Sequence, residues 1–396
     1  MKKQWDYLII GGGIVGLSIG RELVKKDRSS RVLVVEKEPE TAAHASGRNS
    51  GVLHAGFYYS PDSLKAKFCL EGNLKLKQLI EEHNIPINNC GKVVVARNED
   101  DISRMETLYE RGIANGVELH TFEASEISKF EPLAKTHERF LWSPNTSVSD
   151  PVMVTNLIKD LFIAEGGNVI FNTRVKISTD GEVYLNGLQV KAGRIVNAAG
   201  AHAIHLAHQL GAGKNYSQLP VLGLYKYSES KDFPLQRLVY PVPNPKNPFL
   251  GVHFTLTIDG KVKIGPTAIP IVGREQYALR DFPDFQDLQS STRSLANLFM
   301  GSPIGLASLA LTELPKISTR RLVREGHELT NGLSDSIEWK KKKPGIRAQL
   351  VNLEKRSFEM DFVVESYNEF VHVLNAVSPG WTSALPFAKY IVQNYL

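Results

Sequence analysis

DYLIIGGGIVGLSIGRELV, residues 6–24, is the stretch of sequence that decides the fold. Residues 7–10 are aromatic or apolar, as in a buried parallel strand, and glycines follow at once. Gly11, Gly13 and Gly16 form the pattern G-x-G-x-x-G, which permits a tight turn, close approach of the backbone to a pyrophosphate, and packing of a helix on the strand. The stretch therefore predicts a strand, a turn and a helix, with a dinucleotide bound at the helix N-terminus.

The next apolar segment, RVLVVE at residues 31–36, ends in an acidic side chain. Glu36 can accept hydrogen bonds from the 2′- and 3′-hydroxyls of a ribose. A carboxylate at this place disfavours the 2′-phosphate of NADP. The strand, the helix and the acid together make the fingerprint far more specific than its glycines alone.

Length and composition set outer limits. A chain of 396 residues is too long for one ordinary core, so we expect two lobes. The net charge of +5 suits anionic substrates or an anionic membrane surface, and we infer no nucleic-acid partner. Cys69 and Cys90 lie far from any metal-binding or disulfide spacing, so we expect no metal. Because the fingerprint begins a few residues from Met1, we expect no leader segment and a cytoplasmic location.

A loop of small and polar residues follows the second strand, at residues 41–51 (TAAHASGRNSG). Such residues let backbone amides approach a ligand closely. A nicotinamide dehydrogenase would have a plain strand–helix repeat here. A long cradle instead suits FAD, whose isoalloxazine ring extends beyond the pyrophosphate. We therefore predict FAD as the cofactor.

Several longer motifs carry a family resemblance. The run HASGRNSGVLHAGFYYSPDSLKAKFCLEGN at residues 44–73, with CGKVVVA at residues 90–96, resembles the L-2-hydroxyglutarate dehydrogenase/oxidase family of D-amino-acid-oxidase-like flavoproteins. Further matching motifs lie at residues 240–268, 344–351 and 373–391. The resemblance therefore spans nearly the whole chain.

This resemblance implies an architecture and a reaction. The expected fold class is α/β, with a Rossmann-like FAD-binding domain interrupted by an α+β substrate domain that has a mainly antiparallel sheet. The expected reaction is oxidation of a small 2-hydroxy acid, L-2-hydroxyglutarate to 2-oxoglutarate above all, by hydride transfer to flavin N5. The electron acceptor is expected to be a quinone or oxygen. We place the FAD-binding domain at residues 1–87, 150–216 and 344–396, and the substrate-binding domain at residues 88–149 and 217–343.

Between these motifs the hydrophobic pattern predicts ordinary elements. The expected elements are helices at residues 61–83, 99–116, 150–166 and 382–395, and antiparallel strands at residues 222–267 with turns at residues 243–245 and 259–260.

The predicted cofactor-binding residues come from the glycine turn, the acidic strand end, the cradle and three later segments. They are Gly11, Gly13, Ile14, Val15, Gly16, Glu36, Lys37, His44, Ser46, Gly47, Asn49, Ser50, Gly51, Val52, Val175, Ala199, Gly200, Arg347, Gly380 and Thr382. Thr382 is predicted to be the N-cap of the last helix, whose positive end would face the C2 carbonyl of the flavin. Val175 resembles the residue whose backbone meets adenine, and a plain core valine is the alternative.

Oxidation of a 2-hydroxy acid requires a carboxylate clamp and a base for the hydroxyl proton. Arg347 is the predicted clamp because a guanidinium meets a carboxylate at two points, with a structural ion pair as the alternative. His54 is the predicted base and His253 the alternative base. Tyr240 and the tyrosines at residues 58–59 are expected to orient the substrate, although strand aromatics more often belong to the core.

Two other functions stay open. The same flavin could serve an amino-acid or glycerol-3-phosphate oxidase, or the chain could bind flavin without turnover, against which Arg347 and His54 count. The broken apolar segment at residues 295–314 predicts either a buried helical pair or a peripheral contact with the inner face of the membrane. The four lysines at residues 340–343 predict a solvated loop or a contact with anionic lipid.

Overall fold

A Rossmann-like sheet forms one side of the molecule. The computed structural model describes residues 4–396 except 179, 245–246, 248, 279 and 335, and omits the side chains of residues 303, 304 and 306. The turn predicted at residues 243–245 therefore lies partly outside the described residues. β1 (Gln4–Ile10), α1 (Ile14–Lys26) and β2 (Val32–Val35) confirm the strand, turn and helix expected from the glycine fingerprint.

The order of the strands around β1 is that of a nucleotide-binding sheet. β1 pairs in parallel with β2 on one side and β12 (Leu188–Asn197) on the other. The sheet continues in parallel to β9 (Asn168–Ile170) and β23 (Phe370–Asn375). Its antiparallel edges are β10 (Val175–Ile177), β11 (Val183–Leu185) and β22 (Val363–Tyr367).

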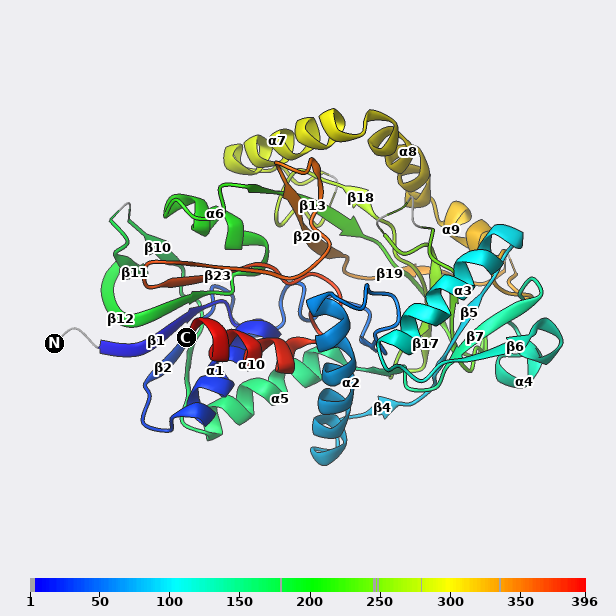
Figure 1. Cartoon of the computed structure of the whole chain (residues 1–396), viewed down its shortest axis with the longest axis horizontal. Coiled ribbons are helices and arrows are strands. Elements are labelled where there is room, and N and C mark those ends of the chain that lie inside the picture. The colour runs from blue at the N-terminus through cyan, green and yellow to red at the C-terminus, as the bar shows by residue number, and fades with distance from the viewer. Residues whose placement is uncertain (1–3, 179, 245–246, 248, 279, 335) are drawn as a thin grey trace.

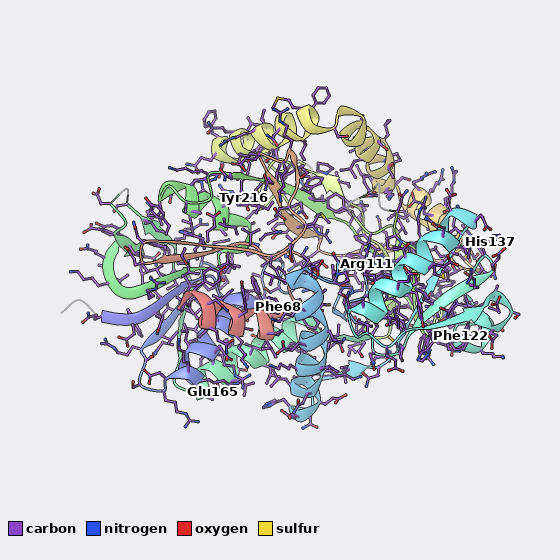
Figure 2. The ribbon with its side chains drawn as sticks, in the orientation of Figure 1. Phe68, Arg111, Phe122, His137, Glu165 and Tyr216 are labelled. Atoms are coloured by element: carbon purple, nitrogen blue, oxygen red, sulfur yellow. The ribbon has the colours of Figure 1, made fainter. Side chains whose placement is uncertain are left out.

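Helices cover one face of this sheet (Figure 1). α1 packs against α5 (Pro151–Ala164) and α10 (Ala384–Tyr395), and α2 (Leu64–Glu82) packs against α10. Phe68, labelled on α2 in Figure 2, contacts two rings of α10. Its ring centroid lies 5.8 Å from that of Phe387 and 5.2 Å from that of Tyr390. The other face carries η2 (Gly200–His202) and α6 (Ala203–Gln209). The apolar side chains of both faces are buried, so this half has its own core.

A second eight-stranded sheet forms the other side of the molecule. Its order is β19-β14-β17-β16-β15-β5-β7-β6, and its pairs are antiparallel except β15 with β5. The strands are β5 (Lys92–Val95), β6 (His120–Glu123), β7 (Arg139–Ser143), β14 (Lys226–Glu229), β15 (Leu238–Pro241), β16 (His253–Leu256), β17 (Lys261–Gly265) and β19 (Lys340–Lys341). α3 (Glu99–Ala114) and α9 (Thr319–Gly326) pack on it. The mainly antiparallel substrate-side sheet expected from the sequence is confirmed.

Two smaller sheets connect the halves. β13 (Tyr216–Gly223) and β20 (Gly345–Asn352) pair along their whole lengths, flanked by β18 (Ile269–Pro270) and β21 (Ser357–Phe358). β3 (Val52–Leu53), β8 (Ser147–Ser149) and β4 (Ile87–Asn88) form the other. The β13–β20 pair joins residues that we assigned to different domains, so the domain boundaries stay a prediction. The remaining short elements are η1 (Ala124–Glu126), α4 (Ile127–Phe130) and η3 (Leu314–Ile317).

The apolar segment at residues 295–314 forms parts of two helices, α7 (Phe285–Gly301) and α8 (Pro303–Glu313), that run along the outer edge of the molecule (Figure 1). Leu298 and Leu309 are buried, whereas Phe299 and Leu311 are exposed, so the pair is only half covered. Within the described part of the chain, no helix is both long and apolar enough to cross a membrane.

Candidate active site

A cavity of about 1460 Å³ lies between the Rossmann-like sheet and the two sheets that carry β16 and β20. Ordinary small-molecule pockets measure about 300–1,000 Å³, so this one has room for a large cofactor and a substrate together. Every predicted site residue lines it except Gly47 and Gly51. A side chain at either of those glycines would meet backbone oxygen, at 2.2 Å from Ala42 and at 2.4 Å from Ser149, so both shape the cradle from behind.

The glycine turn leaves the start of α1 open to the cavity. Gly11 has φ +112°, and a Cβ there would lie 2.5 Å from the carbonyl oxygen of Ala198. A Cβ at Gly16 would lie 2.1 Å from the oxygen of Gly11, so helix and turn can pack only without side chains. Ser46 Oγ accepts a hydrogen bond of 2.9 Å from the backbone N–H of Ile14. Small side chains and helix-terminal N–H groups therefore converge here, as an anion requires.

Glu36 lies at the end of β2, beside this turn. One carboxylate oxygen accepts a 2.8 Å hydrogen bond from Gly12 N–H, and the other accepts a 3.0 Å bond from Glu38 N–H. These bonds fix the carboxylate while it lines the cavity. The geometry fits a ribose acceptor.

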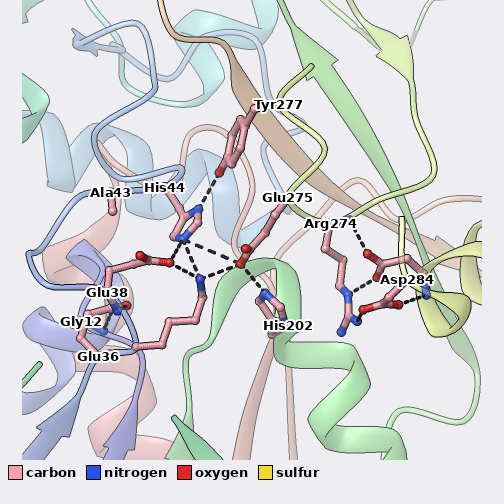
Figure 3. Close-up of polar contacts among 12 residues, drawn as sticks. Gly12, Glu36, Glu38, Ala43, His44, His202, Arg274, Glu275, Tyr277 and Asp284 are labelled. Atoms are coloured by element: carbon pink, nitrogen blue, oxygen red, sulfur yellow. Dashed lines mark hydrogen bonds and ion pairs between the residues drawn. The ribbon is translucent and has the colours of Figure 1, made fainter. Parts of the chain in front are cut away.

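A network of polar side chains lies beside the cradle, on the lining of the cavity (Figure 3). Glu275 pairs with Lys37 Nζ and with His202 Nε2, each at 2.7 Å. His44 lies 2.6 Å from the Tyr277 hydroxyl and 2.9 Å from Glu38. The loop that follows β18 is thereby tied to the cradle and to η2.

Three possible metal-ligand atoms in this network, from Glu38, His44 and Glu275, lie within 4.8 Å of one another. Lys37 Nζ pairs with both carboxylates and lies 2.9 Å from His44 Nε2. The lysine ammonium thus supplies the positive charge that a metal ion would bring to this place.

The Thr382 hydroxyl has a different role from the one that the sequence suggested. α10 begins at Ala384, and its N-cap residue is Ser383, which makes no side-chain cap bond. Thr382 Oγ1 instead donates to Val52 O and accepts from His54 N–H, both at 3.2 Å. The predicted N-cap is therefore wrong: this hydroxyl holds β3, and with it His54, against the start of the last helix.

His54 presents an unpaired imidazole. Its side chain lines the cavity, and neither ring nitrogen has a hydrogen-bond partner among the described residues. Burial, then the nearby positive charges of Lys92, His253 and Arg347, hold the pKa of His54 well below its usual value. The ring is therefore neutral near pH 7, as a proton acceptor must be.

Arg347 lies on β20, opposite Val221 of β13. Its guanidinium lines the cavity and lies 5.4 Å from the ring centroid of Phe249. No carboxylate among the described residues forms an ion pair with it. If Arg347 were part of a structural ion pair, it would need a carboxylate partner, and the described part of the chain offers none. The guanidinium is therefore available to an anionic ligand.

His253 and Tyr240 stack on each other in the substrate-side sheet, with ring centroids 3.8 Å apart. His253 Nδ1 bonds to Gly251 O at 2.8 Å, and burial lowers the pKa of His253 to about 3. The Tyr240 hydroxyl lies 3.4 Å from Thr255 Oγ1. The stacked pair lines the cavity, and the bond to Gly251 O already engages one nitrogen of the His253 ring, whereas His54 Nδ1 has no such bond.

The comparisons with known proteins decide the family. The model of the FAD dependent oxidoreductase family matches residues 6–394. The chain belongs to this family. L-2-hydroxyglutarate dehydrogenase of Escherichia coli K12 is 34% identical, with 98% of this chain and 93% of that protein covered. The mitochondrial L-2-hydroxyglutarate dehydrogenase of Homo sapiens is 32% identical over 98% of this chain and 88% of the relative. These relatives confirm the family resemblance found in the sequence.

Two solved structures share the fold. L-α-glycerophosphate oxidase from Mycoplasma pneumoniae, with FAD bound, has a TM-score of 0.77 at 23% identity, with 99% of this chain and 94% of that chain covered. Glycine oxidase from Geobacillus kaustophilus has a TM-score of 0.72 at 18% identity, with coverages of 98% and 94%. The chain is an FAD-dependent oxidoreductase, and its α/β fold class is confirmed.

The residues that line the cavity fit an FAD molecule. The α1 N-terminus would hold the pyrophosphate and Glu36 the ribose. Val175 lies on β10 and lines the cavity, as an adenine contact would. Ala199, Gly200 and Gly380 line it from two further turns. At Gly380 a Cβ would meet Ala376 O at 2.0 Å, so this turn also requires a glycine.

Sequence reasoning missed three buried lysines. Lys92 packs against two tyrosine rings, with its amine 4.3 Å from the Tyr240 ring centroid and 5.0 Å from that of Tyr58. Lys263 Nζ donates to Ser50 O of the cradle. Lys65 lines the cavity from the first turn of α2. Burial lowers the pKa of each to about 7. A lysine at the start of the apolar run KVVV, or in the first turn of a helix, was the only signal in the sequence.

Proposed function

We propose that this enzyme oxidises a small 2-hydroxy acid to the 2-oxo acid, and that L-2-hydroxyglutarate is its substrate. One observation carries the proposal: Arg347, whose guanidinium forms no ion pair among the described residues, and the neutral imidazole of His54 line the same cavity as the glycine turn. The names of relatives at 32–34% identity support the substrate.

Arg347 would bind the carboxylate next to the reacting carbon. Its planar guanidinium can make two parallel charge-assisted hydrogen bonds, and Phe249 limits its movement on one side. After burial, Tyr59 and Tyr225 have the largest influence on the pKa of Arg347. Burial raises the pKa of both phenols far above neutral, so they stay protonated and can donate to the same carboxylate.

His54 would accept the proton of the substrate hydroxyl. Its free imidazole is neutral, and the carboxylate held by Arg347 would offset one of the positive charges that oppose its protonation. FAD, when bound, supplies the acceptor for the hydride that leaves the substrate carbon. Thr382 keeps the backbone of His54 in place, so the base and the clamp are positioned by rigid elements.

The amino-acid alternative requires an acceptor for the substrate ammonium. Glu359 and Asp361 are acidic residues on the cavity lining. Asp361 already accepts hydrogen bonds from the backbone N–H groups of Leu64, Lys65 and Phe362 at 2.8–3.0 Å. Glu359 Oε1 in turn accepts a 3.4 Å bond from Asp361 N–H, so both carboxylates already bind backbone N–H groups, which favours a hydroxy acid over an amino acid.

A substrate panel tests the proposal. The purified holoenzyme is assayed with L- and D-2-hydroxyglutarate, shorter 2-hydroxy acids, glycerol 3-phosphate and amino acids, each with a dye and with oxygen. We expect turnover of L-2-hydroxyglutarate with the highest kcat/KM. Preferred turnover of glycerol 3-phosphate or of an amino acid would show that the proposed substrate is wrong.

For the electron acceptor we propose a quinone, reached by peripheral contact with a membrane. Exposed apolar side chains on and beside α7 and α8 support this contact: Phe282, Phe285, Phe299, Met300 and Leu311. Flotation with acidic liposomes at low salt, together with faster turnover with a quinone analogue than with oxygen, is the expected result. Rapid peroxide formation without flotation would contradict it. A cytoplasmic location stays an expectation.

A further inference from the structure

Lys65 is a charged residue that the chemistry described so far does not use. It is the second residue of α2, two positions after the N-cap Ser63, and only 4% of its surface is exposed. It nevertheless lines the same cavity as Arg347. Both side chains line one cavity, and after burial the charge of Arg347 is the largest influence on the pKa of Lys65.

The Lys65 ammonium has no partner among the described residues. Its Nζ lies 5.8 Å from the centroid of the Phe362 ring. Asp361 bonds to the backbone N–H of Lys65 and not to its amine. A buried cation without a counter-ion costs free energy, and an anion from solution would recover it. Lys65 and Arg347 are thus two cavity-lining cations that form no ion pair among the described residues, although Asp361 and Glu359 act on the charge of Lys65 from farther away.

We propose that Lys65 binds the second carboxylate of a dicarboxylic substrate while Arg347 binds the carboxylate beside the reacting carbon. This inference rests on the proposed oxidation of a 2-hydroxy acid and makes Lys65 the residue that determines the substrate class. A monocarboxylate of the same length would leave the Lys65 amine buried without an anion. The enzyme would therefore discriminate against it by charge, not by size.

The proposal has a consequence for pH. Burial, then the charge of Arg347, lowers the pKa of Lys65 to about 7, while Asp361, Glu359 and Cys69 oppose this shift. The amine binds a carboxylate only when protonated, so the preference for a dicarboxylate is complete well below pH 7 and decreases as pH rises through about 7. A bound carboxylate raises the pKa, so the decrease occurs at a higher pH in the complex than in the free enzyme.

Binding to the holoenzyme tests this without turnover. The probes are glutarate and pentanoate, of equal length, titrated while the flavin absorbance is recorded at several pH values. In the wild type we expect glutarate to bind ~100-fold more tightly at pH 6, as for a buried charge pair, with a smaller ratio at pH 8.5. A ratio near one, or one that does not change with pH, would overturn the proposal.

Variants separate specificity from folding. Lys65→Met keeps the apolar stem and removes the charge, and should reduce the ratio of kcat/KM for L-2-hydroxyglutarate over L-2-hydroxypentanoate by ~100-fold. Lys65→Arg should retain most of that ratio. Lys67→Met, an exposed lysine on the same helix, is the matched control. Equal losses for both substrates in Lys65→Met, with Lys65→Arg no better, would assign Lys65 a structural role.

Failure of the proposed function has a different signature. If the wild type oxidises neither 2-hydroxy acid yet binds glutarate in preference to pentanoate, with loss in Lys65→Met, the dicarboxylate site stands and the reaction is wrong. If it oxidises both equally well, the reaction stands and the role of Lys65 is wrong.

Discussion

Replacement of Arg347 separates a substrate clamp from a structural ion pair. The guanidinium has no carboxylate partner in the described chain and faces the cavity, so its removal breaks no buried ion pair. Loss of one partner of a buried pair costs ~3–5 kcal/mol of folding stability, whereas removal of a cation that forms no ion pair should leave the free energy of unfolding unchanged or raise it.

The effect on catalysis should be much larger. A lysine keeps the charge but offers one point of contact instead of two, so Arg347→Lys loses one charge-assisted hydrogen bond of ~1.5–3 kcal/mol. This corresponds to roughly a 10- to 150-fold decrease in kcat/KM at 25 °C. Arg347→Met removes both contacts and should lose correspondingly more.

The assay for this prediction combines urea unfolding with steady-state kinetics on 2-hydroxy acids, at equal FAD content. Arg321→Lys, on α9 and outside the cavity, is the matched control. Destabilisation of Arg347→Met by several kcal/mol would show that the arginine has a structural partner. Unchanged kcat/KM in Arg347→Lys would show that the clamp lies elsewhere.

Three further predictions concern the cofactor, the backbone of the base and pH. Glu36→Ala should weaken FAD binding by ~10- to 100-fold, because the ribose and the Gly12 and Glu38 N–H groups lose their acceptor, and full FAD content after dialysis would argue against this role. Thr382→Val should lower the free energy of unfolding in urea by ~1–3 kcal/mol because the hydrogen bonds to Val52 and His54 are lost, while Thr382→Ser should not. Equal stability of both variants would show that these two bonds do not stabilise the fold. Because the pKa of His54 lies well below 6.5, kcat/KM for a monocarboxylic 2-hydroxy acid should stay constant from pH 8 down to pH 6.5; a fall centred near pH 7 would identify another base.

The parts of the fold that local sequence encodes were predictable. The turn after β1 is fixed by Gly11 and Gly16, whose neighbours exclude a side chain, and Glu36 follows at the end of the next strand. These features lie within 36 residues of the start of the chain and depend on contacts that the fingerprint itself specifies. The cradle, Arg347 and His54 could be placed at the cavity because their chemistry is visible in the residue types, and their roles stay predictions.

The remainder depends on contacts between distant parts of the chain. Thr382 looked like an N-cap because a threonine precedes an apolar helix, but its hydroxyl bonds to Val52 and His54, more than 320 residues away. Burial of Lys65 and Lys92 follows from tertiary packing, and lysine is seldom buried, so the residue type offered no reason to expect it. The apolar segment at residues 295–314 was expected to be either a buried helical pair or an interfacial contact, and its helices are half exposed.

An anaerobic single turnover tests the central claim most directly. The yellow holoenzyme is mixed with L-2-hydroxyglutarate without any acceptor, flavin absorbance is followed, and the product is identified. The account predicts bleaching of the flavin with formation of an equal amount of 2-oxoglutarate, and much slower bleaching in Arg347→Met. An absorbance that stays unchanged with L-2-hydroxyglutarate, while glycerol 3-phosphate or an amino acid bleaches the same preparation, would contradict the account.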